Sequence, residues 1–236
     1  MIKGIIFDYG GTLDTSARHW SEVLWEAYEN SRVPITKEQF LEAYVYAERE
    51  LARHPHIQPT HTFYDLLYKK VELEFDNLQE QKITFQPTQR GAYTKQIAEY
   101  CDNVARTQVK QNEPILNELS KTYPMVLVSN FYGNITTVLK EYGIDSYFTS
   151  IVESAVVGVR KPSPQIFKLG VEALKMQPEE VVVIGDSYSK DIQPALEARC
   201  QAIWLKGESW QGKEEKIEYN RTIYTLSELL HIIKEV

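Results

Sequence analysis

The chain has 236 residues, 43% of them hydrophobic and 25% charged, and its 26 Lys and Arg against 33 Asp and Glu give a net charge of −7. This composition excludes an intrinsically disordered chain, and the lack of a basic cluster argues against a nucleic-acid partner. The two cysteines, Cys101 and Cys200, lie far apart and form no metal-binding or redox motif. Because we find no signal peptide and no apolar run of roughly 18 residues, we expect a cytoplasmic protein of one or two domains that has no membrane partner.

The first predicted element is a buried strand over residues 5–7, and the next strand begins only at Met125. This interval is far longer than one crossover helix needs, so a separate unit must fold there. Apolar residues three and four positions apart predict four helices in the interval, which start near Trp20, Thr36, Phe63 and Tyr93. We therefore predict a helical domain over residues 16–107, inserted into a core made of residues 1–15 and 108–236.

The rest of the chain alternates short apolar runs with helical patterns. The predicted strands cover residues 125–128, 151–152, 181–184 and 202–205, and the predicted helices cover residues 115–121, 135–142, 165–174 and 192–198. A capping box at Thr225 predicts one further helix at the end of the chain. Strand and helix in alternation are typical of a parallel sheet with helices on both faces. The predicted fold class is therefore α/β, a doubly wound parallel sheet with a second, smaller, all-helical domain inserted after the first strand.

Polar residues follow the predicted strands where each strand ends. Asp8 follows the first strand, Ser129 the second and Asp186 the fourth, while Lys161 and Asp191 lie a few residues beyond the third and fourth strands. In an open parallel sheet, ligands bind outside the carboxyl ends of the strands. We therefore expect these five side chains to meet at one edge of the sheet.

Taken in chain order, Asp8, Ser129, Lys161, Asp186 and Asp191 resemble the motifs of the haloacid dehalogenase superfamily, whose hydrolases use an aspartate nucleophile. The resemblance covers about the first 15 residues and the chain from about residue 108 onward, whereas the insert resembles the family's helical cap only in position and helical pattern. It implies Mg²⁺ as cofactor and a small phosphorylated molecule as substrate. The implied residues are catalytic Asp8, Ser129 and Lys161, substrate-binding Gly11, Thr12 and Asn130, and metal-binding Asp8, Gly10 through its carbonyl, Asp186 and Asp191.

The chemistry of the residue types agrees with these roles. A carboxylate such as that of Asp8 can attack phosphorus and hold the phosphoryl group as an acyl phosphate, which divides one displacement into two. The Ser129 hydroxyl and the Lys161 ammonium can stabilise the charge on the phosphate oxygens. Two further carboxylates suit a hard divalent cation that also binds the substrate phosphate.

Gly10 departs from the pattern of the family's phosphatases, which carry a second aspartate at this position. That residue protonates the leaving oxygen and later activates water, and loss of general acid–base catalysis typically costs about 10² to 10⁴ in rate. Another group near the site could replace the missing acid. We consider Asp14 and His19 first because they are close in sequence, and then His54 and His56 of the insert.

Several functions share this scaffold, and we expect a magnesium-dependent phosphatase of a small metabolite, slow or selective for its leaving group. Dehalogenases of the superfamily also lack the second aspartate and have the Ser-Asn pair found here at 129–130, but they need no metal. Carbon–phosphorus hydrolases need an imine-forming lysine in the cap, for which Lys37, Lys69 and Lys70 are the candidates. A phosphate-binding or regulatory protein without turnover is a further alternative. In the cap, Arg53, His54, His56 and His61 are candidate substrate contacts.

Overall fold

A computed structural model of the chain describes residues 1–214 and 216–234. Its core is a parallel sheet of six strands in the order β3-β2-β1-β4-β5-β6. The strands are β1 (Gly4–Phe7), β2 (Met125–Ser129), β3 (Ser150–Glu153), β4 (Val181–Gly185), β5 (Gln201–Leu205) and β6 (Thr222–Ile223). The five predicted strands and the predicted fold class are confirmed. The sixth strand, only two residues long, was not predicted.

Alternate residues of the strands pack against helices on opposite faces of the sheet. On one face, Ile6 and Val128 pack with Phe167 in one hydrophobic cluster. On the other face, Ile5 and Leu127 belong to a larger cluster that continues into the inserted helices. The core is therefore doubly wound, and its two apolar layers explain why the strands are rich in Ile, Val and Leu without polar alternation.

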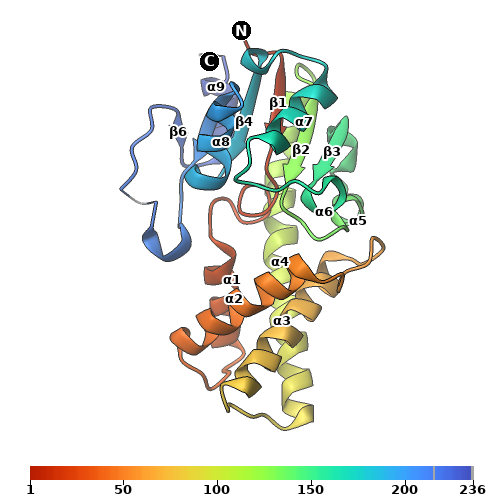
Figure 1. Cartoon of the computed structure of the whole chain (residues 1–236), viewed down its shortest axis with the longest axis vertical. Helices are drawn as coiled ribbons and strands as arrows, with labels where there is room; N and C mark the ends of the chain where they lie inside the picture. The colour runs from red at the N-terminus through yellow and green to blue at the C-terminus, as the bar shows by residue number, and fades with distance from the viewer. Residues whose placement is uncertain (215, 235–236) are drawn as a thin grey trace.

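The insert contains the first four helices of the chain, which lie below the sheet in Figure 1. They are α1 (Trp20–Asn30), α2 (Lys37–Arg53), α3 (Phe63–Glu80) and α4 (Pro87–Ser120). The capping boxes at Thr36 and Thr62 begin α2 and α3. Helix α4 has 34 residues and unites two helices that we predicted separately, even though Pro114 lies inside it. The predicted domain boundary at 107 and 108 thus falls within a continuous helix that leads from the insert to the core.

The remaining helices lie between the strands of the core or, for η5 and α9, after the last strand. They are α5 (Ile135–Glu141), α6 (Ser154–Val157), α7 (Gln165–Leu174), α8 (Gln193–Glu197) and α9 (Leu229–Ile232), together with the short helical turns η1 (Asp145–Tyr147), η2 (Pro178–Glu180), η3 (Tyr188–Ile192), η4 (Trp210–Gly212) and η5 (Leu226–Glu228). The predicted capping box at Thr225 is present. No helix within the described residues is both long and apolar enough to span a membrane.

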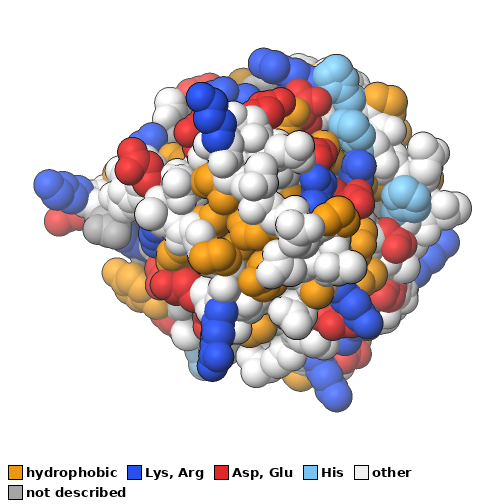
Figure 2. Space-filling model, turned by 90° about the horizontal axis from the view of Figure 1, so that it is seen from below, with side chains coloured by type: hydrophobic (Ala, Val, Ile, Leu, Met, Phe, Trp, Pro, Cys, Tyr) orange, Lys and Arg blue, Asp and Glu red, His pale blue; other side chains and the backbone are white. Residues whose placement is uncertain are grey.

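The connector between α2 and α3 is hydrogen-bonded to α5 of the core and to the residue that precedes α5. The Thr137 hydroxyl donates to the carbonyl of Pro59 at 2.6 Å, and the Asn134 amide donates to the carbonyl of His61 at 3.0 Å. The backbone N–H of Phe63 donates to the Glu141 carboxylate at 3.3 Å. The helical insert is therefore held to the core by this connector as well as by the two chain segments that lead into it. Seen from below, the end at which the insert lies, the surface shows apolar side chains surrounded by charged ones (Figure 2).

Candidate active site

A cavity of about 500 Å³ lies between the insert and the carboxyl ends of the strands, and the residues that line it come from both parts of the chain. This volume is in the range of small-molecule sites. Of the site residues implied by the family resemblance, those that line the cavity are Asp8, Gly10, Gly11, Ser129, Asn130, Lys161, Asp186 and Asp191. Thr12 is fully buried and does not line the cavity.

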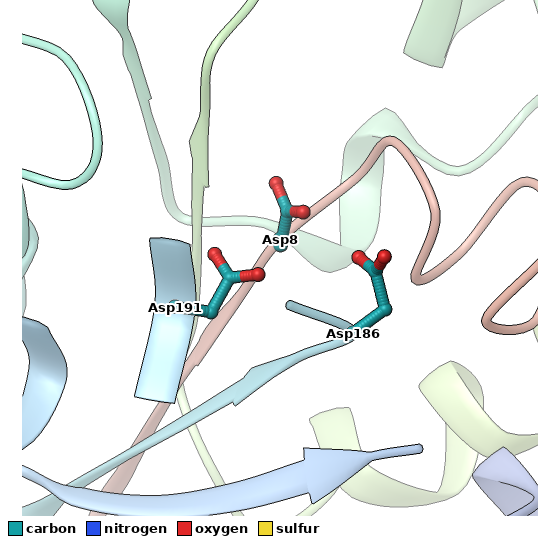
Figure 3. Close-up of side chains that lie close together, drawn as sticks. All are labelled: Asp8, Asp186 and Asp191. Atoms are coloured by element: carbon teal, nitrogen blue, oxygen red, sulfur yellow. The ribbon is translucent and has the colours of Figure 1, made fainter. Parts of the chain in front are cut away.

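Three aspartates point toward a common space at the floor of the cavity (Figure 3). Asp8 follows β1, Asp186 follows β4 and Asp191 lies in η3, and one carboxylate oxygen of each lies within 4.8 Å of the others. Burial raises the pKa of Asp186 well above its usual value, and the neighbouring charges of Asp191 and Asp8 raise it further. Burial likewise raises the pKa of Asp191, to about 6, although the Lys161 ammonium opposes this shift. Three mutually repelling carboxylates, two buried and one half-buried, fit Mg²⁺, which prefers oxygen ligands and keeps some of its water.

Lys161 connects the nucleophile candidate to the acidic cluster. Its ammonium lies 2.6 Å from Asp8 Oδ1 and 2.6 Å from Asp191 Oδ1, and its side chain is buried. Burial opposes the charged form, but the two carboxylates outweigh it and raise the pKa of Lys161. The Asn130 side chain holds the backbone of Lys161, because Asn130 Oδ1 accepts from the Lys161 N–H at 2.8 Å and Asn130 Nδ2 donates to the Lys161 carbonyl at 3.1 Å. Asn130 therefore positions the lysine in addition to lining the cavity.

The loop after β1 is shaped around Asp186. Gly11 has a φ of +94°, and a Cβ at this position would overlap the Asp186 carboxylate, so glycine is required twice over. The Thr12 hydroxyl donates to Asp186 Oδ1 at 3.0 Å and thereby orients a metal-ligand candidate. At Gly10 the backbone is of a kind that other residues adopt, and a Cβ would meet only Trp20 Nε1, at 3.9 Å.

None of the four candidate acids both lines the cavity and carries an acidic proton at pH 7 to replace the aspartate missing at Gly10. Of these four, only His19 belongs to the described lining of the cavity. Asp14 is buried, with one oxygen accepting from the Gly11 N–H at 2.7 Å and the other from Trp20 Nε1 at 3.1 Å, and burial raises its pKa to about 8. Burial lowers the pKa of His19 to about 4, so its imidazole is neutral at pH 7 and carries no acidic proton to donate.

The cap side of the cavity contains one of the three candidate lysines, Lys70, together with Glu48, which was not predicted as a site residue. Lys37 and Lys69 form ion pairs with Glu22 and Glu72, whereas Lys70 lines the cavity. Lys70 pairs with Glu48 of α2, whose second oxygen accepts from the Tyr132 hydroxyl of the core at 3.0 Å. A signal for this pair exists in the sequence, because Glu48 and Lys70 both occupy positions on the apolar stripes of their helices, next to Tyr44 and Leu67.

The other cavity walls are mainly apolar and aromatic. Phe63, Leu66 and Leu67 come from α3, and Trp210 of η4 stacks on Tyr44 with ring centroids 5.6 Å apart. The candidate substrate contacts Arg53 and His61 of the connector lie outside the described lining, as do His54 and His56. The cap residues described in the lining therefore come from α1, α2 and α3 and the segment before α1, not from the connector between α2 and α3.

Phosphatases are among the known proteins that are similar to this chain. A glyceraldehyde 3-phosphate phosphatase of Methanocaldococcus jannaschii is 31% identical over 94 residues, which are 40% of this chain and 41% of the relative. The Escherichia coli 5-amino-6-(5-phospho-D-ribitylamino)uracil phosphatase YigB is 28% identical over 100 residues, 42% of this chain and 40% of the relative. The chain thus matches about two-fifths of the length of each of these two relatives.

The fold has a counterpart among solved structures and a matching family profile. The HAD-hydrolase YfnB of Bacillus subtilis, in a crystal structure with bound magnesium, superposes with a TM-score of 0.65 over 99% of both chains at 20% identity. The sequence profile of the haloacid dehalogenase-like hydrolases matches residues 2–199, which include all five strand-end residues of the site. The chain therefore belongs to the haloacid dehalogenase-like hydrolase family.

Proposed function

We propose that the chain is a magnesium-dependent phosphatase that hydrolyses monoesters of a small phosphorylated metabolite through an aspartyl phosphate at Asp8. The observation that carries the proposal is the convergence of the Asp8 carboxylate, the Lys161 ammonium and two further carboxylates at the floor of one cavity. The two relatives described above are both named as phosphatases of small phosphorylated metabolites, which supports the same substrate class.

The residues of the chain divide the first step among them. The Asp8 carboxylate attacks phosphorus, the bond between phosphorus and the leaving oxygen breaks, and the phosphoryl group remains on Asp8 as an acyl phosphate. Lys161, 2.6 Å from the attacking carboxylate, offsets the charge of the phosphate oxygens, and the buried Ser129 hydroxyl can donate to one of them. Asp186 and Asp191 with Asp8 would hold Mg²⁺. When bound, this ion supplies electrostatic stabilisation of the phosphate oxygens.

Proton transfer is the weak part of this site. The leaving oxygen receives no proton from Gly10, and neither Asp14 nor His19 is placed and protonated to supply one. The second step has the same gap, because no side chain at Gly10 can activate the water that hydrolyses the acyl phosphate. We therefore expect turnover to be slow for alcohols that leave reluctantly and faster for leaving groups that need little protonation.

A panel of phosphate esters tests the proposal. The intact chain is assayed with magnesium and with chelator, and Asp8→Asn serves as the blank. We expect phosphate release that requires both magnesium and the Asp8 carboxylate. No release from any ester in the presence of magnesium would refute the phosphatase and favour the phosphate-binding alternative. Halide release from 2-haloacids that is insensitive to chelator would favour a dehalogenase.

One observation favours a second candidate, the carbon–phosphorus hydrolase. This chemistry needs an amine in the cap, and Lys70 supplies one in the cavity lining, together with a small residue at Gly10. Lys70 forms an ion pair with Glu48, however, and this contact must break before the amine can form an imine. Treatment with a keto- or aldehyde phosphonate and borohydride tests this function. A carbon–phosphorus hydrolase should form a covalent adduct at Lys70, and the Lys70→Arg variant should form none.

A further inference from the structure

The ion pair between Lys70 and Glu48 is unusual because it lies against the cavity at the junction of the cap with the core. Lys70 comes from α3 and Glu48 from α2, and the Lys70 ammonium lies 4.8 Å from the ring centroid of Tyr44. The Tyr132 hydroxyl, from the loop after β2, donates to the second oxygen of Glu48 at 3.0 Å. Three elements thus fix one carboxylate in place, which a surface ion pair would not do.

Both charged side chains line the cavity, but they differ in how exposed they are. The Lys70 side chain is 6% exposed, whereas the Glu48 side chain is 35% exposed. A carboxylate has about four lone-pair sites, and the lysine and the tyrosine use one on each oxygen. Glu48 therefore presents unused acceptor capacity to a molecule in the cavity. Although burial opposes ionisation, the Lys70 ammonium holds the pKa of Glu48 below its usual value, so the group stays an acceptor at neutral pH.

We propose that Glu48, held by Lys70 and Tyr132, is a specificity-determining residue that accepts a hydrogen bond from a hydroxyl group on the leaving alcohol. The inference rests on the proposed function, because it assigns the part of the substrate that lies beyond the phosphate. Glu48 itself would repel an anionic leaving group, which could instead pair with Arg49, Arg160, Lys190 or Lys213 elsewhere in the lining. A cationic one would gain little, because Lys70 already supplies the opposite charge. A neutral hydroxyl can donate to Glu48, while Leu66 and Leu67 of the same wall cover its carbon chain.

Matched phosphate esters test this inference by binding. The Asp8→Asn protein with magnesium, which cannot form the acyl phosphate, is titrated calorimetrically with pentyl phosphate and with ribitol 5-phosphate. The two probes share the phosphate and five carbons and differ in their hydroxyls. We expect ribitol 5-phosphate to bind at least about tenfold tighter, as a hydrogen bond to a charged acceptor can supply. Adding Glu48→Gln should reduce this ratio to below about threefold, mainly through weaker binding of the hydroxylated probe.

Two controls separate recognition from structural damage. Glu72→Gln breaks the Lys69–Glu72 ion pair of the same helix outside the cavity lining, and the binding ratio should stay as in the parent protein. Because Glu48→Gln leaves the buried Lys70 ammonium without its partner, the double variant Glu48→Met/Lys70→Met removes both charges. If it melts cooperatively like the parent, it should bind the two probes about equally.

Three results would overturn the inference. They are an equal affinity of the parent protein for both probes, a ratio that survives in the double variant, and tighter binding of the carboxylate probe 5-phosphonooxypentanoate or the ammonium probe 5-aminopentyl phosphate. Failure of the proposed function is seen separately, because magnesium-dependent release of phosphate from phenyl phosphate involves no hydroxyl on the leaving group. If phosphate is released from phenyl phosphate but ribitol 5-phosphate binds no tighter than pentyl phosphate, only the role of Glu48 is refuted.

Discussion

Replacing Gly10 by aspartate restores the side chain that the site lacks, and the structure indicates that it can be accommodated. The backbone at Gly10 needs no glycine, and a Cβ there would contact only Trp20 Nε1, at 3.9 Å. Strain is therefore not expected to mask the chemical effect. A positioned general acid contributes typically about 10² to 10⁴ in rate, which corresponds to about 2.7 to 5.4 kcal/mol of transition-state stabilisation. We expect Gly10→Asp to raise kcat for an alkyl phosphate by a factor in this range.

The assay compares leaving groups that differ in their need for a proton. With p-nitrophenyl phosphate the first step needs little protonation, so the gain in that step should be much smaller than with an alkyl phosphate. The parent protein should instead show a burst of about one nitrophenolate per chain, because hydrolysis of the acyl phosphate lacks its base. Gly10→Asp should remove the burst by accelerating this second step, and Asp8→Asn should abolish both phases.

Gly10→Asn is the matched control, because it has the shape and hydrogen bonding of the aspartate without the acid. Trp20 Nε1 donates to Asp14 at 3.1 Å, so the new side chain could also act by attracting this N–H. Trp20→Phe in the Gly10→Asp background separates that effect from proton transfer. The reasoning is refuted if Gly10→Asn accelerates the reaction as much as Gly10→Asp, or if the alkyl phosphate gains no more than the aryl ester in the first step.

Three further predictions concern stability and metal binding. Magnesium at about 100 times its Kd should stabilise the fold by about 2.7 kcal/mol, a rise in Tm of about 5 to 10 °C by calorimetry, and Asp186→Asn should lose most of this rise. Lys161→Met leaves Asp8 and Asp191 without their shared cation, so the free energy of unfolding, measured by denaturant titration without metal, should fall by about 3 to 5 kcal/mol and partly recover with magnesium. The same change should lower kcat at least about 10²-fold. Unchanged stability in both conditions would contradict the ion-pair assignment. Burial raises the pKa of Glu74 from 4.5 to about 7, so the folded state binds the extra proton and this carboxyl lowers stability as pH rises from about 4.5 to about 7. Glu74→Gln should therefore be more stable than the parent by up to about 3 kcal/mol at pH 8 and equal to it near pH 4, and a pH-independent difference would show that the group is not the source.

The strands and the floor of the site could be predicted because both depend on local sequence. Runs such as 125–128 and 181–184 are apolar at every position, which is what a strand buried on both faces requires. Parallel topology then brings the residue after each strand to one edge, so Asp8, Ser129 and Asp186 could be placed together before the structure was known. The two-residue strand β6 could not be predicted, because Thr222 and Ile223 carry too little pattern to distinguish a strand from a loop.

The cap side of the site depends on tertiary packing and was predicted only in outline. The four helical stretches follow from periodicity, but the union of two of them into α4 does not, because Pro114 reads as a helix break in sequence. The pairing of Glu48 with Lys70 depends on which faces of α2 and α3 meet, and periodicity of one helix says nothing about its neighbour. The useful signal is a charged residue within an apolar stripe. Glu48, Lys70 and Glu74 all have this position, and all three prove to be in polar contacts within the insert.

The missing proton donor and the cap wall of the cavity both affect the activation barrier for breaking the bond between phosphorus and the leaving oxygen. A site that cannot protonate the leaving oxygen must lower the barrier through interactions that remain, which here are the charge of Lys161 at the phosphate and the orientation of the leaving group by the cap. Binding energy from substrate groups remote from phosphorus accelerates the reaction only where it fixes the reacting atoms in line or is gained in the transition state. Glu48 is suited to orientation because Lys70 and Tyr132 immobilise its carboxylate before substrate arrives. On this account the cap of this chain contributes to rate as well as to selectivity, and its contribution should be largest for the esters that suffer most from the glycine at position 10.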